Sequence, residues 1–306
     1  MKILLATDGS KSAKAAVEFL DRFPLPRDSE LTLLTVIDRQ LFQEEEVKGL
    51  SEERRRSLKE TDKVVREEAE QLLASEAARL RKAGWGGSTE LRLGHPAEEI
   101  VHVAERMDAD LVIVGSHGRT GIKRFLLGSV SDHVLEYAPC SVLIVKALPM
   151  ADGVPEAIPD SQGRRFRVLL AFDDSQPARK AVELCAALPL GEEVGVTAIS
   201  VLPLVTLYRQ DIRQRLSWVW HEKKKAAQEA LEWVTKELRW ATPHVSAELR
   251  ESSDVSHEIL DAATEMNSDL IMLGHKGKGA IEKFLLGSVT TRVAHHAPCS
   301  VLAVRK

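Results

Sequence analysis

Apolar and polar positions along the chain follow two alternating patterns. Short continuous runs of Val, Ile and Leu predict buried β-strands, and the stretches between them carry apolar residues at helical spacing. In the first half we expect strands at residues 3–6, 31–37, 89–93, 111–114 and 142–145. We expect helices at residues 12–22, over a long charged stretch that ends near Ala83, and at 96–107 and 129–137. Buried strands that alternate with helices predict a doubly wound α/β fold with a parallel sheet.

The second half repeats this pattern. The segment KILLATDGS at 2–10 recurs as RVLLAFDDS at 167–175, and residues 110–145 recur without a gap at 269–304. The long helix of the second copy is expected at 214–238. Between the copies lies a stretch rich in Pro, Gly and Asp that has no apolar period, as is typical of a linker. We therefore predict two domains of one Rossmann-like type, at 1–147 and 165–306, joined by a linker at 148–164.

Composition narrows the class of protein. Apolar residues make up 44% of the chain and charged residues 29%, which is typical of a globular protein. The net charge of −4 gives no basic surface for nucleic acid, and no apolar run reaches the roughly 20 residues that span a bilayer. The polar N-terminus does not resemble a signal peptide. The three cysteines, Cys140, Cys185 and Cys299, form no CxxC pair, so we expect buried thiols and a cytoplasmic location.

A glycine motif follows the fourth strand of each copy. It has the form Gly-x2-Gly-x9-Gly-Ser, at Gly115, Gly118, Gly128 and Ser129 in the first copy and at Gly274, Gly277, Gly287 and Ser288 in the second. Glycines let the backbone turn sharply and approach a ligand closely. The last Gly-Ser pair opens a helix, where free N–H groups favour an anion. The motif predicts a phosphate-binding loop.

Structural interpretations of the same residues remain open. Gly118 and Gly128 also suit plain turns, and Ser129 suits a helix N-cap. Asp8 follows the first strand, where a carboxylate can stabilise the next helix N-terminus or meet ribose hydroxyls or a magnesium ion. The two roles of Asp8 are compatible.

The combined pattern resembles the universal stress protein family, in its tandem, ATP-binding form. The resemblance rests on the aspartate after the first strand, the glycine motif and the closing APCSV strand, and it covers both halves. It implies that the chain binds ATP (or ADP or AMP), with magnesium. In the first copy the implied nucleotide-binding residues are Ala6, Thr7, Asp8, Val36, Val114, Gly115, Gly118, Gly128, Ser129 and Val130. In the second copy they are Ala171, Phe172, Asp173, Val201, Leu273, Gly274, Gly277, Gly287, Ser288 and Val289.

The second copy departs from this pattern. Phe172 stands in place of Thr7, and Asp174 stands in place of Gly9, so a bulkier side chain and an extra carboxylate face the second site. We therefore expect the first copy to be the better site.

Other candidate residues favour ordinary roles. The basic loop residues Arg119, Lys123, Arg124, Lys276, Lys278 and Lys283 suit a solvated loop or phosphate contacts. The histidines His117, His275, His295 and His296 lack the spacing of a closed zinc site, and we expect them at the surface without a protein-only metal site. The tryptophans Trp218, Trp220, Trp233 and Trp240 suit packing or an interface.

Three functions fit the sequence. The first is a nucleotide-dependent stress regulator or sensor with slow or no hydrolysis, which acts through an unknown protein partner. The second is a slow ATPase or nucleotidyl transferase. The sequence argues against this second function, because it contains neither a Walker A motif nor an obvious catalytic residue. The third is a ligand-free interaction module. We expect no nucleic-acid or membrane partner.

The final strands predict how the copies associate. A strand that ends each copy, at 142–145 and 301–304, leaves unpaired backbone groups unless another element covers it. The resemblance implies that single-domain members pair there, so we predict an internal pseudo-dimer through these strands. The sequence also permits a homodimer of whole chains.

Overall fold

The computed structural model describes residues 1–38, 51–118, 127–147, 165–204, 217–277 and 286–305. The chain divides into two compact units, Met1–Ala147 and Leu148–Lys306. The linker predicted at 148–164 lies outside the described residues, and so do the loop residues Arg119, Lys123, Arg124, Lys278 and Lys283.

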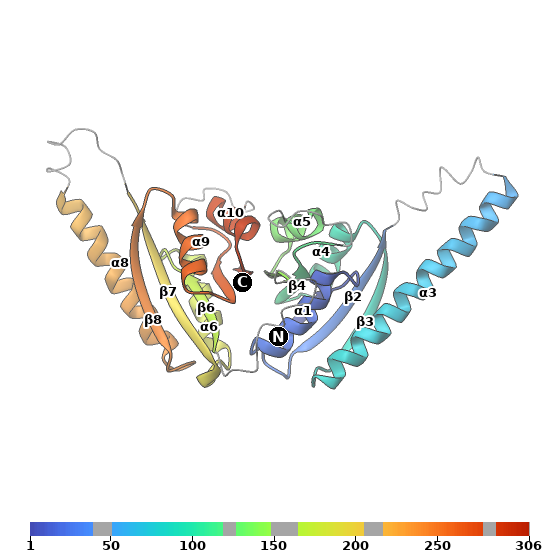
Figure 1. Cartoon of the computed structure of the whole chain (residues 1–306), viewed down its shortest axis with the longest axis horizontal. Helices are drawn as coiled ribbons and strands as arrows, with labels where there is room; N and C mark the ends of the chain where they lie inside the picture. The colour runs from blue at the N-terminus through green and yellow to red at the C-terminus, as the bar shows by residue number, and fades with distance from the viewer. Residues whose placement is uncertain (39–50, 119–126, 148–164, 205–216, 278–285, 306) are drawn as a thin grey trace. The chain divides into compact units, whose positions relative to one another are not determined.

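The first unit is a parallel sheet with helices on both faces (Figure 1). Its described strands are β1 (Lys2–Ala6), β2 (Glu30–Asp38), β3 (Gly87–Gly94), β4 (Leu111–Gly115) and β5 (Ser141–Val145), in the spatial order β3-β2-β1-β4-β5. Its described helices are α1 (Lys11–Arg22), α3 (Glu52–Lys82), α4 (Pro96–Arg106) and α5 (Ser129–Tyr137). Helices α1 and α3 pack on one face, and α4 and α5 on the other. The central strands are almost wholly buried because both faces are covered.

The second unit repeats this architecture. Its described strands are β6 (Phe166–Ala171), β7 (Val194–Pro203), β8 (Val245–Ser252), β9 (Leu270–Gly274) and β10 (Ser300–Val304), in the order β10-β9-β6-β7-β8. Its described helices are α6 (Gln176–Ala187), α8 (Ser217–Leu238), α9 (Val255–Glu265) and α10 (Ser288–His296), with the 3₁₀ turn η3 (Gly191–Glu193) before β7. Helices α6 and α8 cover one face, and α9 and α10 the other.

The predicted doubly wound α/β fold is confirmed in both units. The main differences lie at element ends, where β2 and β3 extend one or two residues beyond the apolar runs. Strand pairing continues there although the side chains are polar, because backbone hydrogen bonds do not require apolar residues. The internal pseudo-dimer stays a prediction.

The strand order places a topological switch point in each unit. In the first unit the chain runs outward from β1 through β2 to β3, and the path through β4 and β5 extends the sheet in the opposite direction. The carboxyl ends of β1 and β4 are therefore neighbours, and their connections lead to opposite faces of the sheet. This is where open α/β sheets bind ligands. Strands β6 and β9 create the same arrangement in the second unit.

The cysteine side chains are buried, whereas the tryptophan side chains differ in their exposure. All three cysteines are buried, and burial raises the pKa of the Cys185 thiol to about 12. Trp233 packs as expected, against Phe172, with ring centroids 5.9 Å apart. Trp218 and Trp240 are 66% and 93% exposed, so they do not pack in the core of the unit, and their role at an interface stays a prediction. Trp240 lies two residues after Leu238, the last residue of α8, so helical spacing no longer directs its side chain toward the core. Within the described residues, no helix has the length and apolar content that crossing a membrane requires.

Candidate functional site

The turn after β1 is held by hydrogen bonds to β2. The Thr7 N–H donates to the Leu34 carbonyl at 2.8 Å, and the Thr35 hydroxyl donates to the Thr7 carbonyl at 2.9 Å. Asp8 comes next, and its Oδ1 accepts the N–H of Ser10 at 2.9 Å. Ser10 is the N-cap of α1. Asp8 thus fixes the cap residue, which lies two positions after it, and the other carboxylate oxygen of Asp8 lies toward the glycine loop.

Gly115 ends β4 where the strand passes very close to α1. A Cβ placed on Gly115 would lie 2.7 Å from the Ser12 carbonyl carbon and 2.8 Å from the Ala13 nitrogen. Backbone atoms cannot give way as a flexible side chain can, so only glycine fits there. Gly274 has the same constraint against Pro177, at 2.6 Å. This first glycine of the motif therefore has a packing role, whatever ligand the loop binds.

Two hydroxyl groups that the sequence reasoning missed fix the glycine loop. The Ser10 hydroxyl donates to the His117 carbonyl at 3.2 Å, and the Ser131 hydroxyl donates to the Gly115 carbonyl at 2.6 Å. In the second unit Ser175 and Thr290 make the matching bonds, at 3.4 and 2.8 Å. A signal was available, because both repeats keep a hydroxyl residue at these two positions.

The N-terminus of α5 differs from most other helices of the chain. Helices α1, α3, α6 and α9 each begin with a side-chain cap, from Ser10, Ser51, Ser175 and Asp254. The N-cap of α5 is Gly128, which has no side chain to accept a hydrogen bond. The interpretation of Ser129 as the N-cap is therefore wrong: Ser129 is the first helical residue and is exposed.

The free N–H groups at the start of α5 need an acceptor. Within the described residues, the N–H groups of Ser129 and Val130 have no hydrogen-bond acceptor. Helix α10 begins in the same way, at Gly287, with Ser288 and Val289 in its first turn. Unsatisfied N–H groups at a helix N-terminus carry partial positive charge and favour an anion. An anion at this position would also lie near the loop that begins at Gly115.

Gly128 and Gly118 lie against the rest of the glycine loop. A Cβ on Gly128 would lie 3.3 Å from the Ser116 carbonyl oxygen, and the Gly128 N–H donates to that same oxygen at 2.8 Å. A Cβ on Gly118 would lie 3.1 Å from Asp8 Oδ2. Both glycines therefore lie where the loop comes into close contact with its neighbours. Asp8, Gly118 and the start of α5 thus lie at the same end of the sheet.

The second unit has a cavity of about 80 Å³ at the matching position. It lies at the carboxyl ends of β6, β7 and β9, and α9 contributes Val255 and Ile259, which the sequence reasoning missed. Eight of the predicted residues line it: Ala171, Phe172, Asp173, Val201, Leu273, Gly274, Gly277 and Val289. Gly287 and Ser288 do not line it. The volume is small beside the roughly 300–1,000 Å³ of typical ligand pockets.

The remaining predicted residues of the first unit lie on neighbouring ends of the same sheet. Ala6 ends β1, and Val36 lies near the end of β2, where it pairs in register with Arg92. Val114 is buried in β4, directly before Gly115. Both Ala6 and Val36 are partly exposed, so they can contact a ligand at this end.

Substitutions in the second unit build a local cluster beside the cavity. Phe172 is 3% exposed and packs on Trp233 of α8, and the Arg179 guanidinium lies 4.6 Å from the centre of a Trp233 ring. Arg179 also pairs with Asp174 at 2.5 Å. Asp174 has φ +60°, close to the +73° of Gly9, so an aspartate here adopts the left-handed conformation. Aspartate tolerates this region better than most residues.

The histidine at the loop start of the second unit is partly buried. His275 replaces Ser116, is partly buried, and lies with its Nδ1 3.1 Å from the Val304 carbonyl oxygen. Burial, with repulsion from Arg305 and Lys276, lowers the pKa of His275 to about 4. The surface position predicted for His275 is therefore met only in part, because its side chain lies against β10. No group of metal-binding side chains occurs among the described residues.

Comparison with known proteins identifies the family. The model of the universal stress protein family matches residues 1–146 and 165–305, so the chain belongs to this family and contains two copies of its domain. Universal stress protein MJ0577 of Methanocaldococcus jannaschii is 33% identical over 47% of this chain and 94% of its own length. A universal stress protein of Mycolicibacterium smegmatis is 26% identical over 99% of this chain and 96% of its own length.

A solved structure supports the fold of the whole chain. The universal stress protein from Archaeoglobus fulgidus matches with a TM-score of 0.57 at 22% identity. The match covers 100% of this chain and 96% of the other. At this identity the likeness concerns the fold alone.

Proposed function

We propose that the chain is an adenine-nucleotide-binding regulator of the stress response, with its main site in the first unit. ATP, ADP or AMP would bind at the carboxyl ends of β1 and β4, and occupancy would change the affinity for a protein partner. Three cysteine thiols without a disulfide fit a cytoplasmic setting.

The uncapped N-terminus of α5 carries this proposal. Its free N–H groups lie at the topological switch point, beside a loop that two hydroxyl groups and a carboxylate hold in place. An adenine nucleotide would supply hydrogen-bond acceptors for these N–H groups, because its phosphates are anionic and are strong acceptors. The partly exposed Ala6 and Val36 suit the less polar end of the nucleotide.

Asp8 is best placed to serve the ribose or a metal ion. A carboxylate repels bare phosphate, so Asp8 would accept hydrogen bonds from ribose hydroxyls or approach a magnesium ion that the nucleotide brings. Magnesium would supply charge neutralisation for the phosphates. We propose at most slow hydrolysis, since the described site contains no side chain arranged to activate water.

Calorimetric titration of the full chain with ATP and magnesium tests the proposal, with Ser129→Pro as the decisive variant. Proline is well tolerated at the first helical position and removes the N–H there. Gly128 precedes it with φ −68° and ψ 150°, a conformation that a residue before proline prefers. We expect affinity to fall about tenfold or more, because a hydrogen bond to a charged group contributes about 1.5–3 kcal/mol.

Two control variants separate the effect of the Ser129 N–H group from other effects of the substitution. Ser129→Ala removes the hydroxyl alone and shows how much of the loss belongs to the N–H group. Ser288→Pro makes the same change in α10 and should leave binding at the first unit unaltered. Absence of ATP binding at millimolar concentration would disprove the proposal, and so would normal affinity in a folded Ser129→Pro variant.

A further inference from the structure

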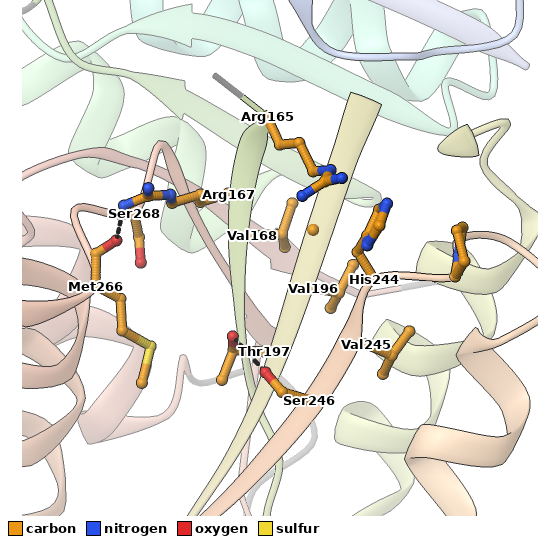
Figure 2. A pocket seen from close by; sticks show the side chains of 12 residues that line it. Arg165, Arg167, Val168, Val196, Thr197, His244, Val245, Ser246, Met266 and Ser268 are labelled. Atoms are coloured by element: carbon orange, nitrogen blue, oxygen red, sulfur yellow. Dashed lines mark hydrogen bonds between the residues drawn. The ribbon is translucent and has the colours of Figure 1, made fainter. Parts of the chain in front are cut away.

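A wide groove lies at the opposite end of the second unit's sheet from the nucleotide site. It has a volume of about 670 Å³, within the range of small-molecule sites. It is formed where β6, β7 and β8 begin and α9 ends, and its polar lining includes Arg165, Arg167, Thr197, His244 and Ser246. Figure 2 shows Arg165 directed toward His244, and Arg167 on the other side, near Met266 and Ser268.

The guanidinium groups of the two arginines in this groove donate to backbone carbonyl oxygens. Arg165 donates through Nε to the Glu192 carbonyl at 3.1 Å, and Arg167 donates to the Met266 carbonyl at 2.8 Å. Neither has an ion-pair partner within the part of the chain that the structure describes. By contrast, Arg179, Arg250 and Arg292 each pair with a carboxylate.

The rest of the lining adds hydrogen-bond donors. The hydroxyls of Thr197 and Ser246 lie 2.9 Å apart across β7 and β8, and Figure 2 shows this pair on the floor of the groove. His244 Nε2 lies 2.8 Å from Glu192 Oε2, so the carboxylate of Glu192 faces the histidine. The donors left for a ligand are two guanidinium groups and the hydroxyl pair.

The first unit keeps part of the framework of this groove with a different charge at one position. Its strands bring Thr32 and Ser88 together in the same way, at 3.2 Å. Strand register pairs Lys2 with Glu30 in the first unit, and Arg167 with Gly195 in the second. A carboxylate therefore stands in the first unit at the position where the second unit has no side chain.

From these contacts we propose that the groove is an anion-binding site, separate from the nucleotide site, for a small ligand with two or more phosphate groups. Guanidinium groups form bidentate hydrogen bonds with phosphate, and the two arginines approach from different sides. A single carboxylate offers two oxygens, too few for both guanidinium groups and the hydroxyl pair. Glycine at position 195 adds no side chain and no carboxylate to the groove.

Gly195 allows a precise test. A Cβ at this position would meet no atom closer than 3.8 Å, so a side chain can be added without steric conflict. Gly195→Glu recreates the arrangement of the first unit, whereas Gly195→Gln has nearly the same size without the charge. Pyrophosphate is the probe, titrated by calorimetry into the full chain at low ionic strength. Arg165→Gln removes one guanidinium group.

We expect wild-type protein and Gly195→Gln to bind pyrophosphate with affinity that falls as salt is added. Gly195→Glu and Arg165→Gln should each weaken binding about tenfold, the equivalent of about 1.4 kcal/mol. Equal affinity of the Glu and Gln variants would overturn the proposal, as would unchanged binding in Arg165→Gln. Malonate that binds as tightly as pyrophosphate would overturn the assignment to phosphate. Nucleotide binding at the first unit is measured separately, with Ser129→Pro.

Discussion

Single residues of the glycine loop serve two purposes at once. Gly115 is needed because a Cβ would lie 2.7 Å from the backbone of α1, and this close approach sets where the loop begins. Asp8 Oδ1 accepts the Ser10 N–H, while Asp8 Oδ2 would meet a Cβ on Gly118. Packing and ligand binding therefore make overlapping demands on these positions. Loss of binding in a glycine variant would not separate them, which is why Ser129→Pro is the better probe.

Also at the scale of single residues, the lowered pKa of His275 predicts how the stability of the second unit depends on pH. Its pKa in the folded chain is about 4, below the ordinary 6.5, because the imidazole is partly buried and faces positive charges. Between these two values the unfolded state binds more protons than the folded state. We expect the free energy of unfolding to fall as the pH drops from 6.5 to 4.

His275→Ser isolates this contribution, since serine occupies the matching position 116 of the first unit. Urea denaturation at pH 7 and pH 5 should show a smaller loss of stability on acidification in the variant than in the wild type. The same pH dependence in both proteins would contradict the assignment to His275.

At the scale of elements, the long helices α3 and α8 distinguish the two units. Buried residues Leu73 and Leu80 of α3 correspond to Leu231 and Leu238 of α8, which places Ser75 where α8 has Trp233. Thr7 stands where the second unit has Phe172. Two small polar residues in one unit thus correspond to a pair of aromatic residues in the other. In the second unit the side chains at these two positions pack against each other.

A double-mutant cycle on Phe172 and Trp233 tests that packing. Phe172→Ala should destabilise the second unit by about 3 kcal/mol, as for a large buried aromatic side chain. The two alanine substitutions should be coupled by about 0.5–1.5 kcal/mol, since aromatic pairs contribute beyond their buried area. Trp240→Ala is the control, because Trp240 is 93% exposed and should add independently to Phe172→Ala. A coupling of zero for Phe172 and Trp233 would refute the contact.

Most elements could be predicted from the sequence, whereas the details of the site could not. Val, Ile and Leu runs locate the strands, because buried parallel strands need apolar residues on both faces. The Gly-Ser pair at 128–129 predicts that a helix begins there. The sequence does not show which of the two residues is the N-cap, because both Gly and Ser suit that position. The hydroxyl bonds of Ser10 and Ser131 bring together residues far apart in sequence, which no local pattern reveals.

At the scale of the whole molecule, duplication has produced two units with one framework and different surfaces. Both keep the glycine loop, the hydroxyl bonds and the uncapped helix. The first keeps Thr7 and Gly9 beside its loop, while the second has an aromatic cluster there and a positive groove at the other end of its sheet. We therefore predict different ligands for the two units. The internal pseudo-dimer through the final strands remains a prediction alongside this one.

A crystal structure of the full chain with ATP and magnesium tests the central claim most directly. The account predicts nucleotide in the first unit, with a phosphate within hydrogen-bond distance of the N–H groups of Ser129 and Val130 and with Asp8 near the ribose or the magnesium ion. Nucleotide bound away from the start of α5 would contradict the account, and so would a first unit without nucleotide at millimolar ATP.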